Sequence, residues 1–114
     1  MSGDEISSEW NIPEGEFCVF GTVYVYPEKA DALEAVYTET TRLARSEAGI
    51  VYYYYCLARD TGDPNVFHFF ERYKSQDAFE EHNGQPITQK VLNEDKYIKR
   101  VTAKFMKPIG LETS

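Results

Sequence analysis

Cysteine and histidine are scarce in this chain of 114 residues, which contains two of each. Cys18 and Cys56 lie within apolar runs and have no Cys-x-x-Cys or Cys/His spacing, so we expect both to be buried free thiols. A metal site built from cysteine and histidine ligands is therefore not predicted.

Long apolar runs and an excess of basic residues are also missing. No run approaches the roughly 20 apolar residues of a membrane span, and the opening MSGDEISSEW lacks the basic start and apolar core of a signal peptide. The formal net charge of -7 argues against nucleic acid or an anionic membrane as partner, since both require a basic footprint. We expect a cytoplasmic protein whose ligand is a neutral or weakly charged small molecule.

The length is that of a single domain. Residues 1–15 mix acidic residues, serine, glycine and proline around a lone Trp10, and are expected to form a flexible N-terminal arm. Residues 16–109 are expected to form the folded domain, and residues 110–114 a short C-terminal tail.

Hydrophobic patterning predicts seven elements in the folded part. Four runs rich in β-branched and aromatic residues predict strands at 17–26, 50–59, 66–73 and 98–106. Apolar residues spaced three and four apart predict helices at 27–46, from the N-cap Ser75 to Gly84, and at 87–93. Gly21, inside the first strand, predicts a bulge or the close approach of another group.

The element order is β-α-β-β-α-β, that of a ferredoxin-like α+β fold with a four-stranded antiparallel sheet and its helices on one face. The second strand, within GIVYYYYCL, is nevertheless apolar on both sides. Since helices cover only one face, we predict a homodimer whose sheets pack back to back. Tyr52 and Tyr54 then face one side and Tyr53 and Tyr55 the other; one pair lines a cavity and the other fills the interface, in an order the sequence leaves open.

With its elements in this order, the chain resembles the antibiotic biosynthesis monooxygenase (ABM) family of small dimeric α+β barrels. Residues 47–49, Glu-Ala-Gly, match the family's Glu-Pro-Gly with alanine in place of proline, and Tyr53 matches the tyrosine that follows. The resemblance extends over about residues 17–108.

Two further segments carry the resemblance. In FHFFERY, Glu71 and Arg72 fall on the family's Glu-Arg pair, with Tyr73 where tryptophan is usual. In SQDAFEEH, Ala78 and His82 match the alanine and histidine of the family's helix. The haem-degrading branch uses an asparagine in the first strand and a tryptophan in the third, and the absence of both argues against that activity.

The resemblance implies a cavity in each protomer, between sheet and helices. It also implies oxygenation of quinols, anthrones and related phenolic intermediates of secondary metabolism, with no cofactor, neither flavin nor metal. The resulting expectation is a cofactor-independent monooxygenase that oxidises a small phenolic, quinol- or anthrone-like, or otherwise activated cyclic metabolite with molecular oxygen. The alternatives are an isomerase or tautomerase that uses the same base without oxygen, and a non-catalytic small-molecule-binding dimer.

His82 and Glu71 are the candidate catalytic residues. His82 shares a helical face with Ala78 and Phe79 and should point inward, and imidazole is suited to proton transfer near neutral pH. The alternative is a histidine that packs at the helix end. Glu71, in an apolar strand, is expected to be paired or protonated, with a purely structural partnership to a tyrosine hydroxyl, an arginine or a lysine as the alternative.

The candidate substrate-binding residues are aromatic side chains of the second and third strands: Tyr52, Tyr53, Tyr54, His68, Phe69 and Tyr73. Tyrosine hydroxyls could orient a phenolic ligand or stabilise its anion. His68 has the parity of Val66 and Phe70, so it faces either the dimer layer or the cavity. Arg72 and Lys104 are expected to face solvent, with a contact to a substrate carboxylate as the alternative.

Overall fold

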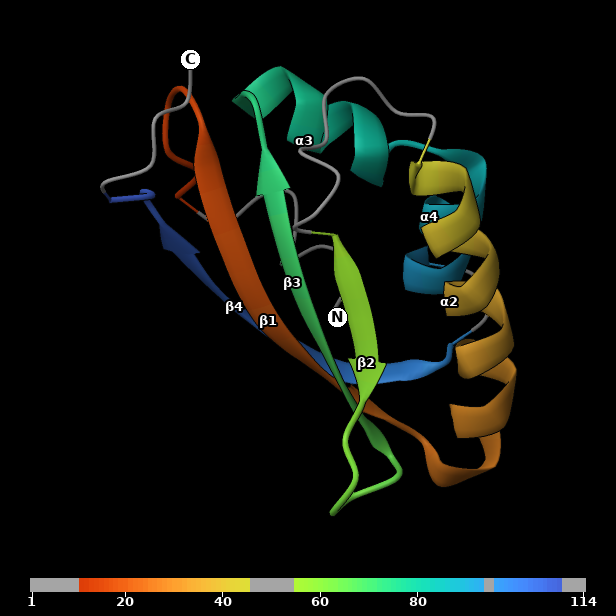
Figure 1. Ribbon diagram of the computed structural model, residues 1–114. Helices are drawn as coiled ribbons and strands as arrows, with labels where there is room; N and C mark the ends of the chain where they lie inside the picture. The colour runs from red at the N-terminus through yellow and green to blue at the C-terminus, as the bar shows by residue number, and fades with distance from the viewer. Residues whose placement is uncertain (1–10, 46–54, 94–95, 110–114) are drawn as a thin grey trace.

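The computed structural model describes residues 11–45, 55–93 and 96–109, apart from the side chains of residues 87 and 91–93. Its elements are β1 (Phe17–Val25), a 3-10 turn η1 (Pro27–Lys29), α2 (Ala30–Ala44), β2 (Cys56–Arg59), β3 (Val66–Tyr73), α3 (Gln76–Asn83), α4 (Pro86–Asn93) and β4 (Ile98–Met106). The strands form one antiparallel sheet in the order β2-β3-β1-β4 (Figure 1). The predicted ferredoxin-like α+β fold is confirmed, although the part of the second strand before residue 55 lies outside the described residues.

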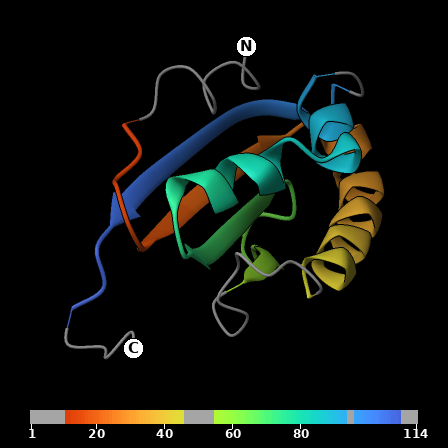
Figure 2. The same ribbon diagram turned by 90° about the horizontal axis from the view of Figure 1, so that it is seen from above.

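The three α-helices lie on the same side of the sheet (Figures 1 and 2). On β1, the odd-numbered residues from Phe17 to Val25 are all buried on this side. They alternate with residues of the opposite face, of which Phe20 is exposed. Apolar residues recur at every second position of β1 and at every third or fourth position of α2. Each element therefore has one apolar face, and the two faces pack against each other. None of the helices within the described ranges is long and apolar enough to cross a membrane.

The buried side chains form two clusters between sheet and helices. The first surrounds Leu33 of α2 and comprises Val23, Val25, Ala30, Leu33, Phe67, Ile98 and Val101. The second surrounds Phe79 of α3 and comprises Phe17, Val19, Ala44, Tyr73 and Phe79. Phe69 packs against both clusters and therefore connects them.

Gly21 lies opposite Phe69 in the pairing of β1 with β3. A Cβ atom at Gly21 would lie 2.1 Å from Cζ of Phe69, so the close approach predicted for this glycine is present. The alternative, a bulge at Gly21, is not observed: the register with β3 and β4 is regular there, and the pairing of β1 with β4 shifts only between Tyr24 and Val25.

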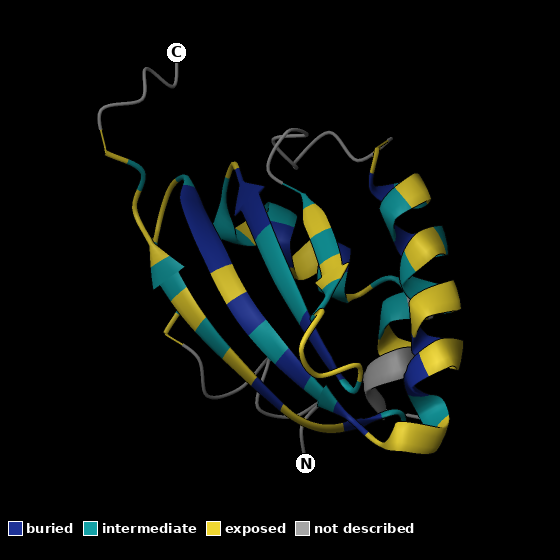
Figure 3. Ribbon diagram, turned by 60° about the horizontal axis from the view of Figure 1, so that its bottom comes forward, coloured by how far each residue is buried: buried dark blue, intermediate teal, exposed yellow. Residues whose placement is uncertain are grey.

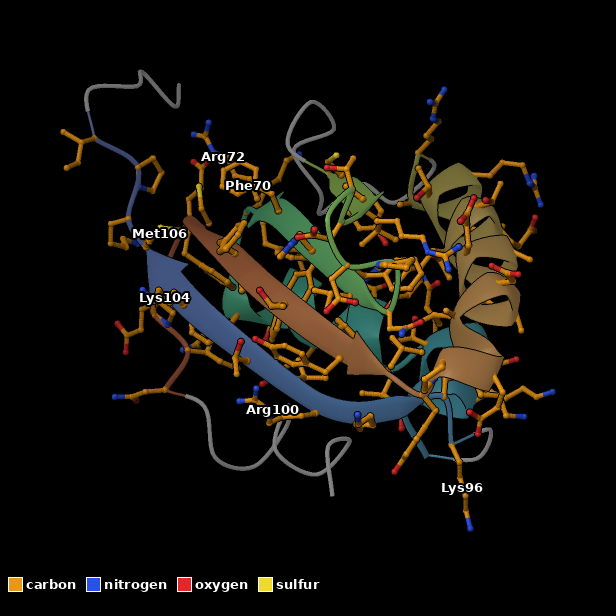
Figure 4. All side chains as sticks on the ribbon, turned by 90° about the horizontal axis from the view of Figure 1, so that it is seen from below. Phe70, Arg72, Lys96, Arg100, Lys104 and Met106 are labelled. Carbon is orange, nitrogen blue, oxygen red and sulfur yellow. The ribbon has the colours of Figure 1, made fainter. Side chains whose placement is uncertain are left out.

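The face of the sheet away from the helices is called the open face below. Its exposed apolar side chains include Phe20 and Met106, and the ring of Tyr24 packs against the guanidinium of Arg100, 4.1 Å from its centroid. Figure 3 shows the alternation of exposed and buried residues along β1 and β4, and Figure 4 labels Met106 and Arg100 with Phe70 and Lys104.

Two predictions about side chains of this face are wrong. Cys56 is exposed rather than buried, because β2 is an edge strand and no element of the described chain covers its open face. Arg72 is buried rather than solvent-facing, because its guanidinium forms an ion pair with Glu16. Cys18 is buried and Lys104 is exposed, as expected.

The described end of the predicted N-terminal arm is attached to the domain. Ile12 packs against the second cluster, and its carbonyl accepts a hydrogen bond of 2.8 Å from Nε2 of Gln76. Nζ of Lys107 donates to the carbonyl of Glu14 over 2.7 Å. Residues 11–16 thus lie against α3 and the end of β4, while Trp10 and the preceding residues lie outside the described range.

The cap of α3 provides a test of the fold. Oγ of Ser75 accepts a hydrogen bond of 3.1 Å from the backbone N–H of Ala78, which otherwise has no partner within the first turn. Ser75→Ala should therefore lower the free energy of unfolding by about 1 kcal/mol, measured by urea denaturation. The matched control is Thr38→Ala, an exposed mid-helix position of α2, where little change is expected. Equal effects of the two substitutions would contradict the capping role.

Candidate functional site

A cavity of about 80 Å³ lies between the helices and the sheet, where the two clusters meet. Its apolar walls are Val23, Leu57, Phe69, Phe79, Ile98 and Val101. Its polar lining residues are Tyr37, Thr40, Tyr55, Glu71, His82, Asn83 and Thr88. An apolar cavity with a few convergent polar groups is the usual form of a small-molecule site, although this one is smaller than the ~300 Å³ lower bound typical for drug-sized ligands.

His82 is buried and points into the cavity from α3. Ser75 fixes the start of this helix, so Phe79 and His82, three residues apart, both face inward while Glu80 and Glu81 are exposed. Nε2 of His82 lies 3.3 Å from the hydroxyl of Tyr55, and the two rings meet edge to face at 5.3 Å. The inward orientation predicted for His82 is therefore observed.

Tyr55 belongs to one of the two tyrosine pairs of which either could line the cavity, but it was not among the candidate substrate-binding residues. It has the parity of Leu57, which lines the same cavity, so strand alternation was the signal that could have identified it. When Nε2 of His82 carries no proton, the Tyr55 hydroxyl donates to it. Tyr52, Tyr53 and Tyr54, the predicted substrate-binding residues of this strand, lie outside the described residues.

Glu71 is a buried carboxylate that also lines the cavity. The hydroxyl of Tyr73 donates a hydrogen bond of 2.6 Å to its Oε1, so a tyrosine hydroxyl, one of the partners expected for Glu71, is present. Tyr73 itself is fully buried between Phe17 and Phe79, with ring centroids at 5.9 and 5.1 Å. Tyr73 therefore supports the cavity from behind rather than forming its wall.

Tyr37, from α2, is a second lining residue that the sequence did not identify as functional. Burial raises the pKa of Tyr37 well above its ordinary value of 10.0, and the charge of Glu71 raises it further. Tyr37 therefore keeps its proton, and with it a hydrogen-bond donor, even in alkaline solution where an exposed tyrosine would ionise. Since no lysine or arginine is among the described lining residues, the cavity contains a carboxyl group and no permanent cation.

The other predicted site residues are separated by the sheet. Phe69 lines the cavity, whereas His68 lies on the open face. Nε2 of His68 is 2.7 Å from Oδ2 of Asp60, and Nδ1 is 3.1 Å from the hydroxyl of Thr22. His68 is thus held by groups outside the cavity, and its ring stacks on Phe20.

Among the residues described, no three or more histidine, cysteine, aspartate or glutamate side chains are grouped in a way that could hold a metal ion.

The chain is similar to known proteins in both sequence family and fold. The family model described as antibiotic biosynthesis monooxygenase matches residues 16–93, more than half of the chain. No curated protein shows significant similarity to the sequence.

Solved structures with the same fold are numerous. The PA3566 protein of Pseudomonas aeruginosa superposes with a TM-score of 0.73 at 20% identity, covering 88% of this chain and 99% of that one. Rv0793 of Mycobacterium tuberculosis gives a TM-score of 0.69 at 24% identity, covering 87% and 99%. A structure described as an antibiotic biosynthesis monooxygenase gives 0.71 at 22% identity, covering 82% and 98%. At these identities the likeness shows the fold.

The raised pKa of Tyr37 provides a test of the site. Above pH 10 the unfolded chain releases this proton while the folded protein keeps it, so the free energy of unfolding falls as pH rises. One such proton contributes a slope of about 1.4 kcal/mol per pH unit. Tyr37→Phe should make the decline between pH 10 and 11 shallower by up to that amount, measured by urea denaturation. The control is Tyr26→Phe, which removes the hydroxyl of an exposed tyrosine. If it changes the decline of the free energy of unfolding between pH 10 and 11 as much as Tyr37→Phe does, the raised pKa of Tyr37 is contradicted.

Proposed function

The chain belongs to the antibiotic biosynthesis monooxygenase family, and on that premise we propose that it is a cofactor-independent monooxygenase. Its substrate is a small, neutral phenolic, quinol- or anthrone-like, or otherwise activated cyclic metabolite, which it oxidises with molecular oxygen. The observation that carries the proposal is the pair formed by His82 and Tyr55 at the wall of the cavity between sheet and helices.

Proton removal is the step that the protein itself performs. The acidic group of the bound substrate replaces the Tyr55 hydroxyl at Nε2 of His82 and gives its proton to this nitrogen, and the resulting carbanion or phenolate reduces oxygen directly. For an activated CH₂ group, the carbon gains a C=O bond, and the second oxygen atom leaves as water with the two hydrogens of the CH₂ group. Oxygen is the only oxidant required, and no external reductant is needed. A positioned histidine base of this kind contributes about 10²- to 10⁴-fold to the rate.

The hydroxyls beside the base stabilise the substrate anion. Tyr55, 3.3 Å from Nε2 of His82, fixes the imidazole and donates a hydrogen bond to the anion once Nε2 has taken the proton. Tyr37 contributes a second neutral phenol to the cavity. These donors act in an apolar environment, where hydrogen bonds to an anion are stronger than in water.

In this proposal Glu71 disfavours ligands that carry a negative charge. Its carboxyl group lines the cavity and is held by Tyr73, while Arg72, the adjacent cation, pairs with Glu16 outside it. A substrate carboxylate would meet a carboxyl group and no compensating lysine or arginine among the described lining residues. The substrate therefore enters as a neutral molecule.

The same pair of residues supports a second candidate function. Tyr55 can donate and His82 can accept a proton within one cavity, which is the arrangement that an isomerase or tautomerase requires. Such an enzyme would convert its substrate without consuming oxygen, so oxygen uptake separates the two functions.

Oxygen consumption tests the proposed function. The protein, treated with EDTA, should consume oxygen with small single-ring quinols, and His82→Asn should lower the rate about a hundredfold or more. Tyr55→Phe should lower it less, because the base remains. The control is Glu80→Gln, an exposed residue on the outer side of the same helix, with an unchanged rate expected. Full activity of His82→Asn would overturn the assignment of the base, and substrate conversion without oxygen uptake would favour the isomerase.

The open face supports a homodimer with back-to-back sheets. Phe20 at its centre is 42% exposed and Met106 is 38% exposed, and in the described part of the chain no helix covers this side. Apolar side chains gathered on one sheet face are typical of an interface. A two-fold axis through this face leaves both cavities, which lie between sheet and helices, away from the interface.

Sedimentation equilibrium tests the dimer. At micromolar concentration the protein should have twice the mass of its 13.2 kDa chain. Phe20→Asp places an unpaired charge in the interface and should give the mass of a single chain. Ile109→Asp is the matched control, because Ile109 is a large apolar residue that is 93% exposed beyond the end of β4. A single-chain mass for the unsubstituted protein would contradict the dimer.

A further inference from the structure

We propose that Gly21, which does not line the cavity, is a specificity-determining residue that acts through Phe69. Among the substrates proposed above, the two residues together select single-ring phenols and quinols and reject fused-ring compounds such as anthrones. This inference rests on the proposed function, because it concerns the size of the ligand that the same cavity accepts.

The first step is why position 21 holds glycine. Gly21 does not have a positive φ, so its backbone conformation is open to other residues. The reason is space: a Cβ atom there would lie 2.1 Å from Cζ and 2.4 Å from Cε1 of Phe69, and 2.6 Å from the carbonyl oxygen of Thr102. Real Cβ contacts are not this short, so any side chain at position 21 would displace the ring or strand β4.

The second step is what the ring of Phe69 does in this position. Gly21 and Phe69 are cross-strand partners, and the ring occupies the space that a side chain at position 21 would take. Phe69 lines the cavity and contacts both core clusters, which meet there. Because Phe69 leans over β1, part of the space above the sheet remains open as the cavity. A ring displaced from Gly21 would occupy that space.

The third step is the size of the ligand. A cavity of about 80 Å³ is well below the ~300 Å³ at which typical drug-sized sites begin. Phe69 provides an aromatic wall, and His82 and Tyr55 provide the polar groups. The ligand that fits is a neutral planar ring with its proton donor directed at His82. A fused second ring would meet Phe69 or Phe79, since protein interiors are closely packed.

Binding of phenol and 2-naphthol, two neutral phenols that differ by one fused ring, tests the size limit. Affinities measured by isothermal titration calorimetry should favour phenol in the unsubstituted protein. Phe69→Ala removes the wall and should raise the affinity for 2-naphthol relative to phenol about tenfold or more, since burial of the extra ring becomes possible. Phe69→Leu should give an intermediate ratio.

The matched control is Phe105→Ala. Phe105 is a partly buried phenylalanine of β4 that contacts the second cluster and does not line the cavity, so its substitution should leave the affinity ratio unchanged. If phenol binds and the ratio of the affinities for 2-naphthol and phenol is the same in Phe69→Ala as in the unsubstituted protein, the size limit is overturned and the proposed function stands. Failure of both phenols to bind to either protein would overturn the two together.

The role of Gly21 is tested without a ligand. Gly21→Ala should lower the melting temperature, and should lower it less in a Phe69→Ala background, where the displaced ring is absent. If the single variant fails to fold, folding of Gly21→Ala/Phe69→Ala supports the coupling. Two results would overturn the inference by showing that only Thr102 constrains position 21. One is an equal loss of melting temperature in the two backgrounds. The other is that neither Gly21→Ala protein folds although Phe69→Ala alone does.

Discussion

The absence of a side chain at Gly21 determines how the interior of this protein is divided. Phe69 leans into the space at Gly21 and contacts both the cluster around Leu33 and the cluster around Phe79. The two clusters are thereby joined at the sheet while a cavity remains above it. A close-packed core is normally continuous. Here one missing Cβ allows a single ring to serve both as core and as wall of a site.

Charge is distributed between the two faces of the sheet in a way that suits proton removal from a neutral molecule. On the helix side, Glu71 accepts a hydrogen bond from Tyr73 and lines the same cavity as His82, and no lysine or arginine is among the described lining residues. On the open face, Arg100 covers Tyr24 and Lys104 is exposed. Because strand residues alternate between faces, Glu71 and Arg72 can be neighbours in sequence and still act in separate environments.

The sequence predicted what depends on local periodicity. The helix cap at Ser75 and the inward orientation of His82 both follow from spacing within one segment, and both are observed. The exposure of Cys56 and the burial of Arg72 depend instead on which strand is at the edge and on a partner in another segment. Tyr55 falls between the two cases: alternation assigns it a face, but only the packed helices decide that this face contains the cavity.

The outer edge of β4 has a consequence for how the protein behaves at high concentration. An edge strand exposes unpaired backbone groups that can pair with any other strand. On β4, Lys99, Arg100 and Lys104 are exposed and the strand contains no acidic residue. Two such positively charged edges repel each other, and this repulsion opposes both the pairing of molecules into continuous sheets and their aggregation. The strand that closes one side of the core thus also carries the positive charge that opposes edge-to-edge association, in a molecule whose net charge is negative.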